Sequence, residues 1–250
     1  MDSRINRNFA CGTKIRDRPM KIGVIAAMSS EREQLARLLA NLHTEDHGRQ
    51  GYTVGELAGH TIYIMECGIG KVNAAVGATN MMNDLQPDAV VSTGVAGGID
   101  ARVGVMEVVA ASHVVYHDVW CGMGNVKGQV QGLPPMFDCH PALVQVAASL
   151  DGETPVHTGL VCTGDQFISA REELDAIKAS FAEGLAVDME SAAIAHVCHL
   201  YGVPFISFRI ISDTPGADGH WQQYENFWQT MADRSFGVVR AFLASLPAAL

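Results

Sequence analysis

The sequence predicts a single α/β domain, and two observations support this prediction. From Lys21 to the C-terminus, apolar runs of strand length alternate with segments whose apolar residues recur at helical spacing. The chain has 250 residues, of which 48% are hydrophobic, and this is enough for one substantial core. Because no internal repeat or linker divides it, we expect one domain over residues 20–250, preceded by a disordered N-terminal extension over residues 1–19.

The expected elements follow one another in a regular order. An apolar run over 21–28 predicts a strand buried on both faces, and Ser29 or Ser30 can cap a helix that extends to about Leu39. Residues 61–65 predict the next strand, before a helix whose apolar face is formed by positions 72, 76, 79, 82 and 85. Further strands are expected over 89–92, 108–115, 159–162, 184–187 and 204–211, and further helices over 141–150, 171–181, 191–197 and 223–246.

Composition argues against several classes of protein. The formal net charge of −10 disfavours nucleic-acid binding, because a phosphate backbone needs a basic surface. No window approaches eighteen uninterrupted apolar residues, and the polar N-terminal residues lack the apolar stretch of a secretory signal. The 6 cysteines form no close pairs of the kind that bind zinc. We therefore expect a cytoplasmic protein with reduced thiols, without a metal site and without a membrane or nucleic-acid partner.

Glycine-rich turns follow two of the expected strands. Gly68-Ile69-Gly70 is similar to a dinucleotide-binding turn, but Asn73 stands where the third glycine should be. We interpret these glycines, and those of segment 93–98, as positions where backbone amides approach a ligand. Segment 117–137 has no periodicity and is long for a simple connection. Its apolar residues predict a loop that buries surface on a ligand or across a subunit interface.

Carboxylates follow three of the expected strands. Glu31 comes after the first strand, Glu190 after the strand over 184–187, and Asp213 after the last one. In an α/β sheet the carboxyl ends of strands meet at the rim where ligands bind, so we expect these acids to surround one pocket. Such a trio suits a reaction that builds positive charge on its substrate. Asp188 and Glu190 could instead interact only with the positive end of the following helix, and for Asp188 support of the turn is an alternative.

The sequence resembles the 5′-methylthioadenosine/S-adenosylhomocysteine nucleosidases of the purine nucleoside phosphorylase superfamily. The resemblance covers the chain from Met20 onward. It implies a three-layer α/β fold with a mixed, twisted central sheet flanked by helices, and a homodimer. It also implies hydrolysis of the adenine–ribose bond without a metal or organic cofactor. The resemblance rests on separated blocks: 21–28 with Glu31, 68–72, 93–98, 116–118, 164–168, 187–190 and 209–213.

The resemblance implies roles for the acids. Glu31 would be the base that activates the water, and Asp213 would place a proton on N7 of the departing adenine. Glu190, beside Met189, would hold the ribose hydroxyls. These roles agree with the chemistry, because the bond breaks through an oxocarbenium-like state in which carboxylates near the sugar gain interaction energy.

The resemblance also implies the residues that bind the substrate. Phe167 would stack on adenine, the backbone around Ile168 would recognise the edge of the base, and Ile69 would line the wall near the 5′ substituent. Tyr224 or Phe227 would cap the pocket, and spacing does not choose between them. The other substrate-binding positions lie in the glycine-rich turn: Val95, Ala96 and Gly97.

Alternatives remain open at this point. A phosphorolytic nucleoside phosphorylase of the same superfamily commonly needs an arginine near the first βα turn and a serine in the glycine-rich segment, where this chain has Glu31 and Val95. Val95 also departs from the nucleosidase pattern, in which a serine helps to set the catalytic aspartate. Other donors, such as backbone amides of residues 94–98, would then orient Asp213.

Several 5′-modified nucleosides are alternative substrates. The divergent loop over 117–137 leaves the 5′ group open, so 5′-deoxyadenosine or an aminofutalosine-type nucleoside could replace methylthioadenosine and S-adenosylhomocysteine. A non-catalytic nucleoside-binding domain is a further possibility, but a binding module has no use for a water-activating base.

Overall fold

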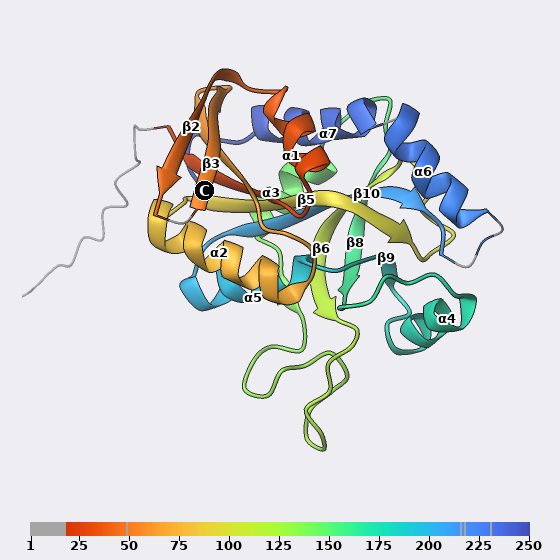
Figure 1. The fold of residues 1–250 in the computed structure, drawn as a ribbon. Coiled ribbons are helices and arrows are strands. Elements are labelled where there is room, and N and C mark those ends of the chain that lie inside the picture. The colour runs from red at the N-terminus through yellow and green to blue at the C-terminus, as the bar shows by residue number, and fades with distance from the viewer. Residues whose placement is uncertain (1–18, 49, 216, 218, 231) are drawn as a thin grey trace, which may run out of the picture.

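The computed structural model describes residues 19–250 apart from 49, 216, 218 and 231, so residues 1–18 of the expected extension lie outside the described residues. A mixed, 10-stranded sheet forms the centre, in the order β10-β6-β8-β9-β5-β1-β4-β3-β2, with β7 paired to β6. Helices flank it, as Figure 1 shows. The strands are β1 (Lys21–Ala26), β2 (Ala40–His47), β3 (Gln50–Leu57), β4 (His60–Glu66), β5 (Ala89–Gly98), β6 (Val108–Tyr116), β7 (Phe137–Asp138), β8 (Val156–Thr163), β9 (Gly184–Asp188) and β10 (Phe205–Asp213).

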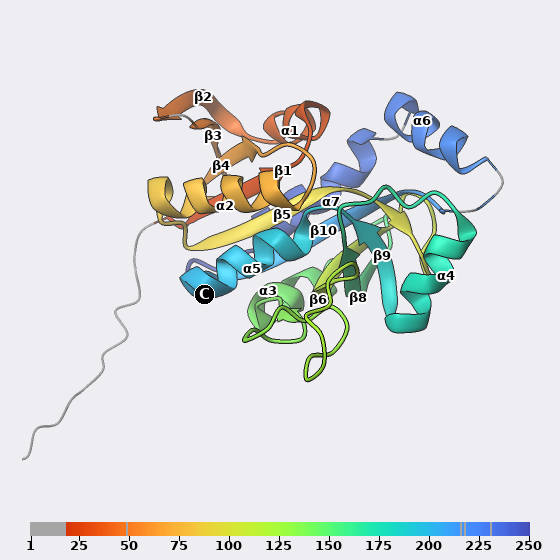
Figure 2. The same cartoon turned by 60° about the horizontal axis from the view of Figure 1, so that its bottom comes forward.

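The helices lie in two layers. Figures 1 and 2 show α1 and α7 on one side of the sheet, and α2 and α5 next to each other on the other side. Helix α7 is held against β10 by Phe242 and Phe208, whose ring centroids are 4.6 Å apart. None of the helices in the described part of the chain has the length and apolar character that a membrane span requires. The helices are α1 (Ser29–Ala36), α2 (Lys71–Leu85), α3 (Pro141–Ala148), α4 (Arg171–Ser180), α5 (Ser191–Tyr201), α6 (His220–Thr230) and α7 (Ala232–Ala244).

Part of the sheet closes on itself. Strand β10 pairs with β5 in parallel and with β6 in the antiparallel direction. From β6 the sheet continues through β8 to β9, and β9 returns to β5 in the antiparallel direction. The mixed, twisted sheet predicted from the sequence is therefore confirmed, with a curled half that brings β9 and β10 to opposite sides of β5.

Gly97 lies where these strands converge. It pairs with Val187 of β9 on one side and with Asp213 of β10 on the other. A Cβ atom at this position would lie 2.7 Å from Cγ of Pro215 and 3.3 Å from Cγ1 of Val187, so a side chain here would push the strands apart. The close approach places the ends of β5, β9 and β10 at one rim, as expected from the acids that follow or end these strands.

The structure corrects several sequence predictions. Strands β2, β3 and β7 were not expected. Strand β2 is polar and mostly exposed at the edge of the sheet, so it lacks an apolar alternation. The C-terminal helix expected over 223–246 is two helices, α6 and α7. At the start of α1, Met28 rather than Ser29 or Ser30 occupies the N-cap position.

The predicted apolar face of α2 is wrong in its first half. The side chains of Val72 and Val76 are 74% and 55% exposed, whereas Ala74, Gly77 and Ala78 face the sheet. Small residues are needed here because the helix approaches closely: a Cβ at Gly77 would lie 2.8 Å from Cβ of Cys67. The contact between α2 and the sheet requires small residues, whatever their hydrophobicity, and the larger apolar residues of the helix face outward.

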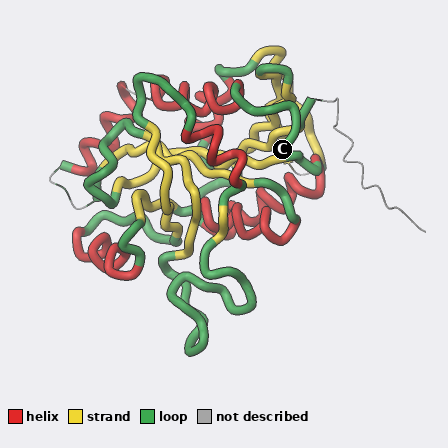
Figure 3. The backbone as a smooth tube through the Cα atoms, turned by 180° about the vertical axis from the view of Figure 1, so that it is seen from behind, coloured by secondary structure: helices red, strands yellow, loops and turns green. Residues whose placement is uncertain are grey.

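The loop between β6 and β7 extends away from the body of the molecule, as Figure 3 shows from behind. Some of its apolar residues are exposed in the single chain, including Trp120 at 63% and Met123 at 96%, whereas Val119, Val130 and Leu133 are partly buried against the core. The expected burial of this surface would therefore require a partner.

Candidate active site

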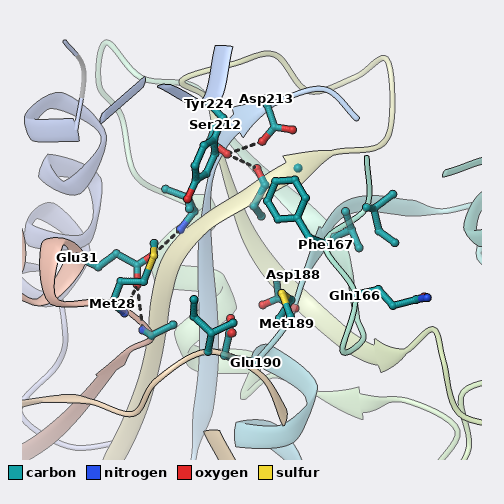
Figure 4. A pocket seen from close by; sticks show the side chains of 17 residues that line it. Met28, Glu31, Gln166, Phe167, Asp188, Met189, Glu190, Ser212, Asp213 and Tyr224 are labelled. Carbon is teal, nitrogen blue, oxygen red and sulfur yellow. Dashed lines mark hydrogen bonds between the residues drawn. The ribbon is translucent and has the colours of Figure 1, made fainter. Parts of the chain in front are cut away.

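A pocket of about 630 Å³, counting its open mouth, lies at the rim where the strands converge (Figure 4). The structure brings every site residue predicted from the sequence into its lining: Glu31, Ile69, Val95, Ala96, Gly97, Phe167, Ile168, Met189, Glu190 and Asp213. The prediction did not name some other lining residues, among them Met28, Gln166 and Ser212.

Glu31 is positioned by backbone amides from two elements. Its Oε2 accepts hydrogen bonds from the N–H groups of Ala27 (2.9 Å) and Met28 (3.1 Å), which closes the turn from β1 into α1. Its Oε1 accepts a hydrogen bond from the N–H of Val95 in β5, at 3.0 Å. The carboxylate therefore stabilises its own helix terminus and joins it to the central strand, while it also lines the pocket.

The environment of Glu31 makes it more basic than an ordinary glutamate. The residue is 2% exposed, and burial raises its pKa, although the charge of Arg209 and the three backbone hydrogen bonds partly offset this effect. Gly94 lets the carboxylate approach β5 closely, because a Cβ there would lie 2.5 Å from Oε1 of Glu31.

Arg209 is a buried cation in the middle of β10. Its Nε donates to the carboxylate of Asp188, its Nη2 donates to Oγ of Ser92 at 2.9 Å, and its Nη2 lies 4.0 Å from Oε2 of Glu190. Burial disfavours the charged guanidinium, but the charges of Asp188, Glu190 and Glu31 outweigh it and raise the pKa of Arg209. The guanidinium thus stays charged and links three acids.

Asp188 and Glu190, two residues apart, have different partners. Asp188 accepts hydrogen bonds from the N–H and hydroxyl of Ser191 and from the hydroxyl of Thr163, so it is Asp188 that stabilises the start of α5. Glu190 instead reaches across the pocket, where its Oε1 accepts the N–H of Gly70 at 2.9 Å. The helix-terminus interpretation therefore holds for Asp188.

The same surroundings affect the protonation of Glu190. Burial, followed by the charge of Asp188, raises the pKa of Glu190 to about 7, against the opposing effects of Arg209 and of the hydrogen bond from Gly70. Burial and the charge of Asp188 therefore make Glu190 easier to protonate than an exposed glutamate.

Asp213 ends β10 and is 3% exposed. Its Oδ1 accepts a hydrogen bond from the hydroxyl of Ser212 at 2.7 Å, and the same Ser212 oxygen lies 3.3 Å from the carbonyl oxygen of Ala96, as Figure 4 shows in part. The N–H of Val95, which we expected near Asp213, is the donor to Glu31. The orienting hydroxyl for Asp213 thus comes from the neighbouring residue, and the sequence analysis missed it.

The other wall of the pocket is aromatic. Phe167 follows β8, and its ring meets that of Tyr224 from α6 edge to face, with centroids 5.9 Å apart and planes at 83°. Tyr224 lines the pocket, whereas Phe227 is 1% exposed and lies in the hydrophobic core. Of the two residues considered as a cap, the structure therefore places Tyr224 at the site.

An ion pair and two hydrogen bonds join the start of α2, the β6–β7 loop and the segment after β8. Nζ of Lys71, the first residue of α2, lies 2.7 Å from Oδ2 of Asp118 in the β6–β7 loop. The backbone N–H of Lys71 donates to Asp165 at 2.7 Å, and the N–H of Asp165 donates to Asp118 at 2.9 Å. These contacts connect the turn that holds Glu190 with the segment that carries Phe167.

Comparison with known proteins agrees with this geometry. The family model for the phosphorylase superfamily matches residues 21–244. A 5′-methylthioadenosine/S-adenosylhomocysteine nucleosidase from Chromohalobacter salexigens is 40% identical over 230 residues, which cover 90% of this chain and 97% of that protein. The chain belongs to the 5′-methylthioadenosine/S-adenosylhomocysteine nucleosidase family. The resemblance found in the sequence is thereby confirmed.

Solved structures of nucleosidases share the fold. The S-adenosylhomocysteine nucleosidase of Streptococcus pyogenes, in complex with 5-methylthiotubericidin, has a TM-score of 0.86 and 34% identity, with 92% of this chain and 98% of that chain covered. The nucleosidase of Colwellia psychrerythraea 34H in complex with adenine has a TM-score of 0.86 and 34% identity, covering 93% and 98%.

Two polar residues of the site in this nucleosidase-family chain were not predicted from the sequence: Ser212, which lines the pocket, and Arg209, which lies behind the lining. Arg209 interrupts an otherwise apolar strand, and a buried arginine needs a carboxylate nearby, so its position alone could have indicated a buried ion pair. Ser212 gave a weaker signal, because a serine before an aspartate at a strand end is common in turns.

The buried pair of Asp188 and Arg209 is expected to dominate the stability of the site. Asp188→Asn should lower the free energy of unfolding by about 3 kcal/mol, because the charge of Arg209 loses its closest partner in the core. Urea unfolding would measure the loss. Asp175→Asn, which breaks the exposed pair with Arg171, is the control and should cost less than about 1 kcal/mol. Equal losses in the two variants would contradict a special role for the buried pair.

Proposed function

We propose that this protein hydrolyses the N-glycosidic bond of 5′-methylthioadenosine and S-adenosylhomocysteine, releasing adenine and the 5′-substituted ribose. The observation that supports this most directly is the convergence of Glu31, Glu190 and Asp213 on one apolar pocket. The family relatives are nucleosidases of this kind, and one related structure contains adenine. The domain of residues 20–250 would perform the reaction by itself or as part of a dimer.

Glu31 is the proposed base. Each carboxylate oxygen can accept two hydrogen bonds. Oε1 is used once by Val95, so it keeps capacity for a water molecule, and the raised pKa makes the group a better proton acceptor. Asp213, held by the hydroxyl of Ser212, is the proposed acid for N7 of adenine. Proton transfers of this type contribute about 10²- to 10⁴-fold each.

Glu190 is the proposed ligand of the ribose hydroxyls, with Met189 beside it. As the bond to adenine breaks, positive charge develops on the sugar, and ionised carboxylates nearby interact more strongly with the transition state than with the substrate. This difference in binding lowers the barrier. The mechanism requires no metal ion and no organic cofactor.

The substrate would extend along the pocket from base to 5′ group. Phe167 would stack on adenine, and the backbone around Ile168 would recognise its edge. Ile69, which is 53% exposed at the mouth, would contact the 5′ substituent. Val95, Ala96 and Gly97 form the remaining wall of the pocket, and their backbone would lie close to the sugar.

Hydrolysis is favoured over phosphorolysis by the charges of the pocket. Among the described residues that line it, none is a lysine or an arginine. Arg209, just behind the lining, is already committed to Asp188 and to Ser92. A phosphate ion needs cations and free donors, whereas this pocket offers carboxylates.

We also propose that the protein acts as a homodimer in the cytoplasm. Helices α2 and α5 lie together and expose an apolar face: Val72, Val76, Leu200 and Tyr201. The projecting β6–β7 loop adds Trp120 and Met123. An exposed apolar surface of this kind marks an interaction site, and a second copy would cover it symmetrically. In the cytoplasm the free cysteines would stay reduced.

The hydrolase assignment is tested by incubating the protein with methylthioadenosine, with and without phosphate, and following adenine release. Glu31→Gln and Asp213→Asn should each lower kcat by at least about 100-fold, because each removes a proton-transfer group. Glu33→Gln, an exposed position on the same helix α1, is the matched control and should leave kcat unchanged. Circular dichroism would verify that the variants are folded.

Three outcomes would contradict this assignment. Adenine release that depends on phosphate would identify a phosphorylase, and retained activity in either variant would remove that residue from its role. If no 5′-modified adenosine released adenine, the nucleosidase proposal would fail. Rates across methylthioadenosine, S-adenosylhomocysteine, 5′-deoxyadenosine and an aminofutalosine-type nucleoside would then define the 5′ group that the pocket prefers.

The raised pKa values predict a pH dependence. If Glu190 acts as an ionised group, kcat/KM should fall as the pH drops below about 7, because this carboxylate then gains a proton; the raised pKa of Glu31 acts in the same direction. A profile from about pH 5 to about pH 9 would measure this. In Glu190→Gln the residual activity should lose one of the two protonations and fall less steeply. A flat profile down to about pH 5 would show that Glu190 does not need to be ionised.

The proposed dimer is tested by light scattering coupled to gel filtration. Val76→Asp on α2 should convert the dimer to a monomer, because two buried charges would face each other across a symmetric interface. Leu42→Asp, at an apolar residue of β2 that is 50% exposed, is the control and should leave the mass unchanged. A wild-type protein that is monomeric at all concentrations would refute the dimer.

A further inference from the structure

The aromatic wall of the pocket continues beyond the residues that line it. The ring of Trp221, in the first turn of α6, stacks on Phe167 with centroids 5.1 Å apart and planes at 15°. Tyr224, three residues later on the same helix, meets the Trp221 ring edge to face at 6.4 Å. A chain with only 7% aromatic residues therefore places three rings in mutual contact at this one wall.

The three rings differ in whether they line the pocket. Phe167 and Tyr224 line the pocket, whereas Trp221 lies outside its described lining. A ring has two faces, and Trp221 covers one face of Phe167, so a ligand in the pocket can use only the opposite face or the edge. A purine stacked on that opposite face would have Phe167 between itself and Trp221.

We infer that Trp221 is a positioning residue for the purine base: it supports Phe167 from behind, so that the base stacks on a platform of two rings. This inference rests on the proposed function, in which Phe167 binds adenine. Trp221 does not contact the base itself; it contacts Phe167, on which the base stacks. Because Trp221 and Tyr224 share one face of α6, the stack also holds Tyr224 at the pocket.

Support of this kind has a characteristic kinetic consequence. Unsupported, the Phe167 ring, which is 45% exposed, can sample other rotamers, and each base that binds must first order it. The chemical groups Glu31 and Asp213 come from α1 and β10, so they are unaffected. Loss of Trp221 should therefore weaken binding of the base while leaving kcat nearly unchanged.

The experiment uses Trp221→Leu, which keeps an apolar side chain, and Trp221→Phe, which keeps a ring. In Trp221→Leu we expect the KM for methylthioadenosine and the dissociation constant for adenine to rise about threefold to tenfold, the range of one aromatic pair. The inhibition constant of methylthioribose, which has no base, should stay unchanged. Trp221→Phe should restore most of the affinity for adenine.

The same change made in a Phe167→Leu variant distinguishes a positioning role of Trp221 from a purely structural one. In Phe167→Leu, adding Trp221→Leu should have no further effect on adenine binding, because the platform is already lost. Thermal unfolding of all variants would show whether α6 remains in place. The inference is overturned if Trp221→Leu leaves adenine binding unchanged, if it strengthens binding, or if its effect is equally large without Phe167.

Calorimetric measurement of adenine binding also distinguishes a failure of this inference from a failure of the proposed function. If the wild-type protein releases no adenine from any nucleoside but binds adenine, the nucleosidase proposal fails while the platform is still tested by the variants. If the wild-type protein does not bind adenine, the platform is refuted regardless of the reaction.

Discussion

The ion pair between Arg209 and Asp188 is the interaction on which the pocket depends. A charge removed from water costs several kcal/mol, so the guanidinium stays in the core only because carboxylates surround it. The reverse also holds, because Asp188, Glu190 and Glu31 would repel one another without a cation between them. Since Asp188 ends β9 and Arg209 lies within β10, the pair also fixes these two strands relative to each other.

The acids around this cation differ in how much of their hydrogen-bonding capacity remains. Asp188 accepts from Thr163, from Ser191 and from Arg209, which leaves it little to offer a ligand. Glu31 and Glu190 accept mainly from backbone amides, face the pocket, and have pKa values raised by burial. Carboxylates within a few residues of one another therefore acquire separate roles from their environment, and chemical identity alone does not assign them.

The sequence predicted the acids of the site well because strand ends determine their place. Buried strands are recognisable as apolar runs, and their carboxyl ends share a rim, so Glu31, Glu190 and Asp213 could be grouped without coordinates. Arg209 could not be assigned to Asp188 in the same way, because their contact depends on how β9 and β10 are arranged around β5. Register and curvature of a sheet are set by tertiary contacts that periodicity does not contain.

The helices show the same limit. The pattern of α2 was interpreted by hydrophobicity, but its contact with the sheet selects for small residues, and the outward face retains valines. In contrast, β10 was predicted close to its observed bounds and α5 was predicted to start at the observed residue, although α5 continues to Tyr201, four residues beyond the expected end. The sequence predicted elements correctly where burial in the core alone determines which positions are apolar. It failed where close packing of a helix on the sheet, or an absent partner chain, determines them.

Val95 contributes to the site through its backbone. It donates a backbone N–H to Glu31, which every residue other than proline provides, so this hydrogen bond does not depend on the side chain at position 95. The hydroxyl beside Asp213 comes from Ser212. The side chain of Val95 makes the surface next to Glu31 apolar in the pocket lining. An apolar neighbour withholds solvation from the carboxylate, and this acts in the same direction as the burial that raises the pKa of Glu31.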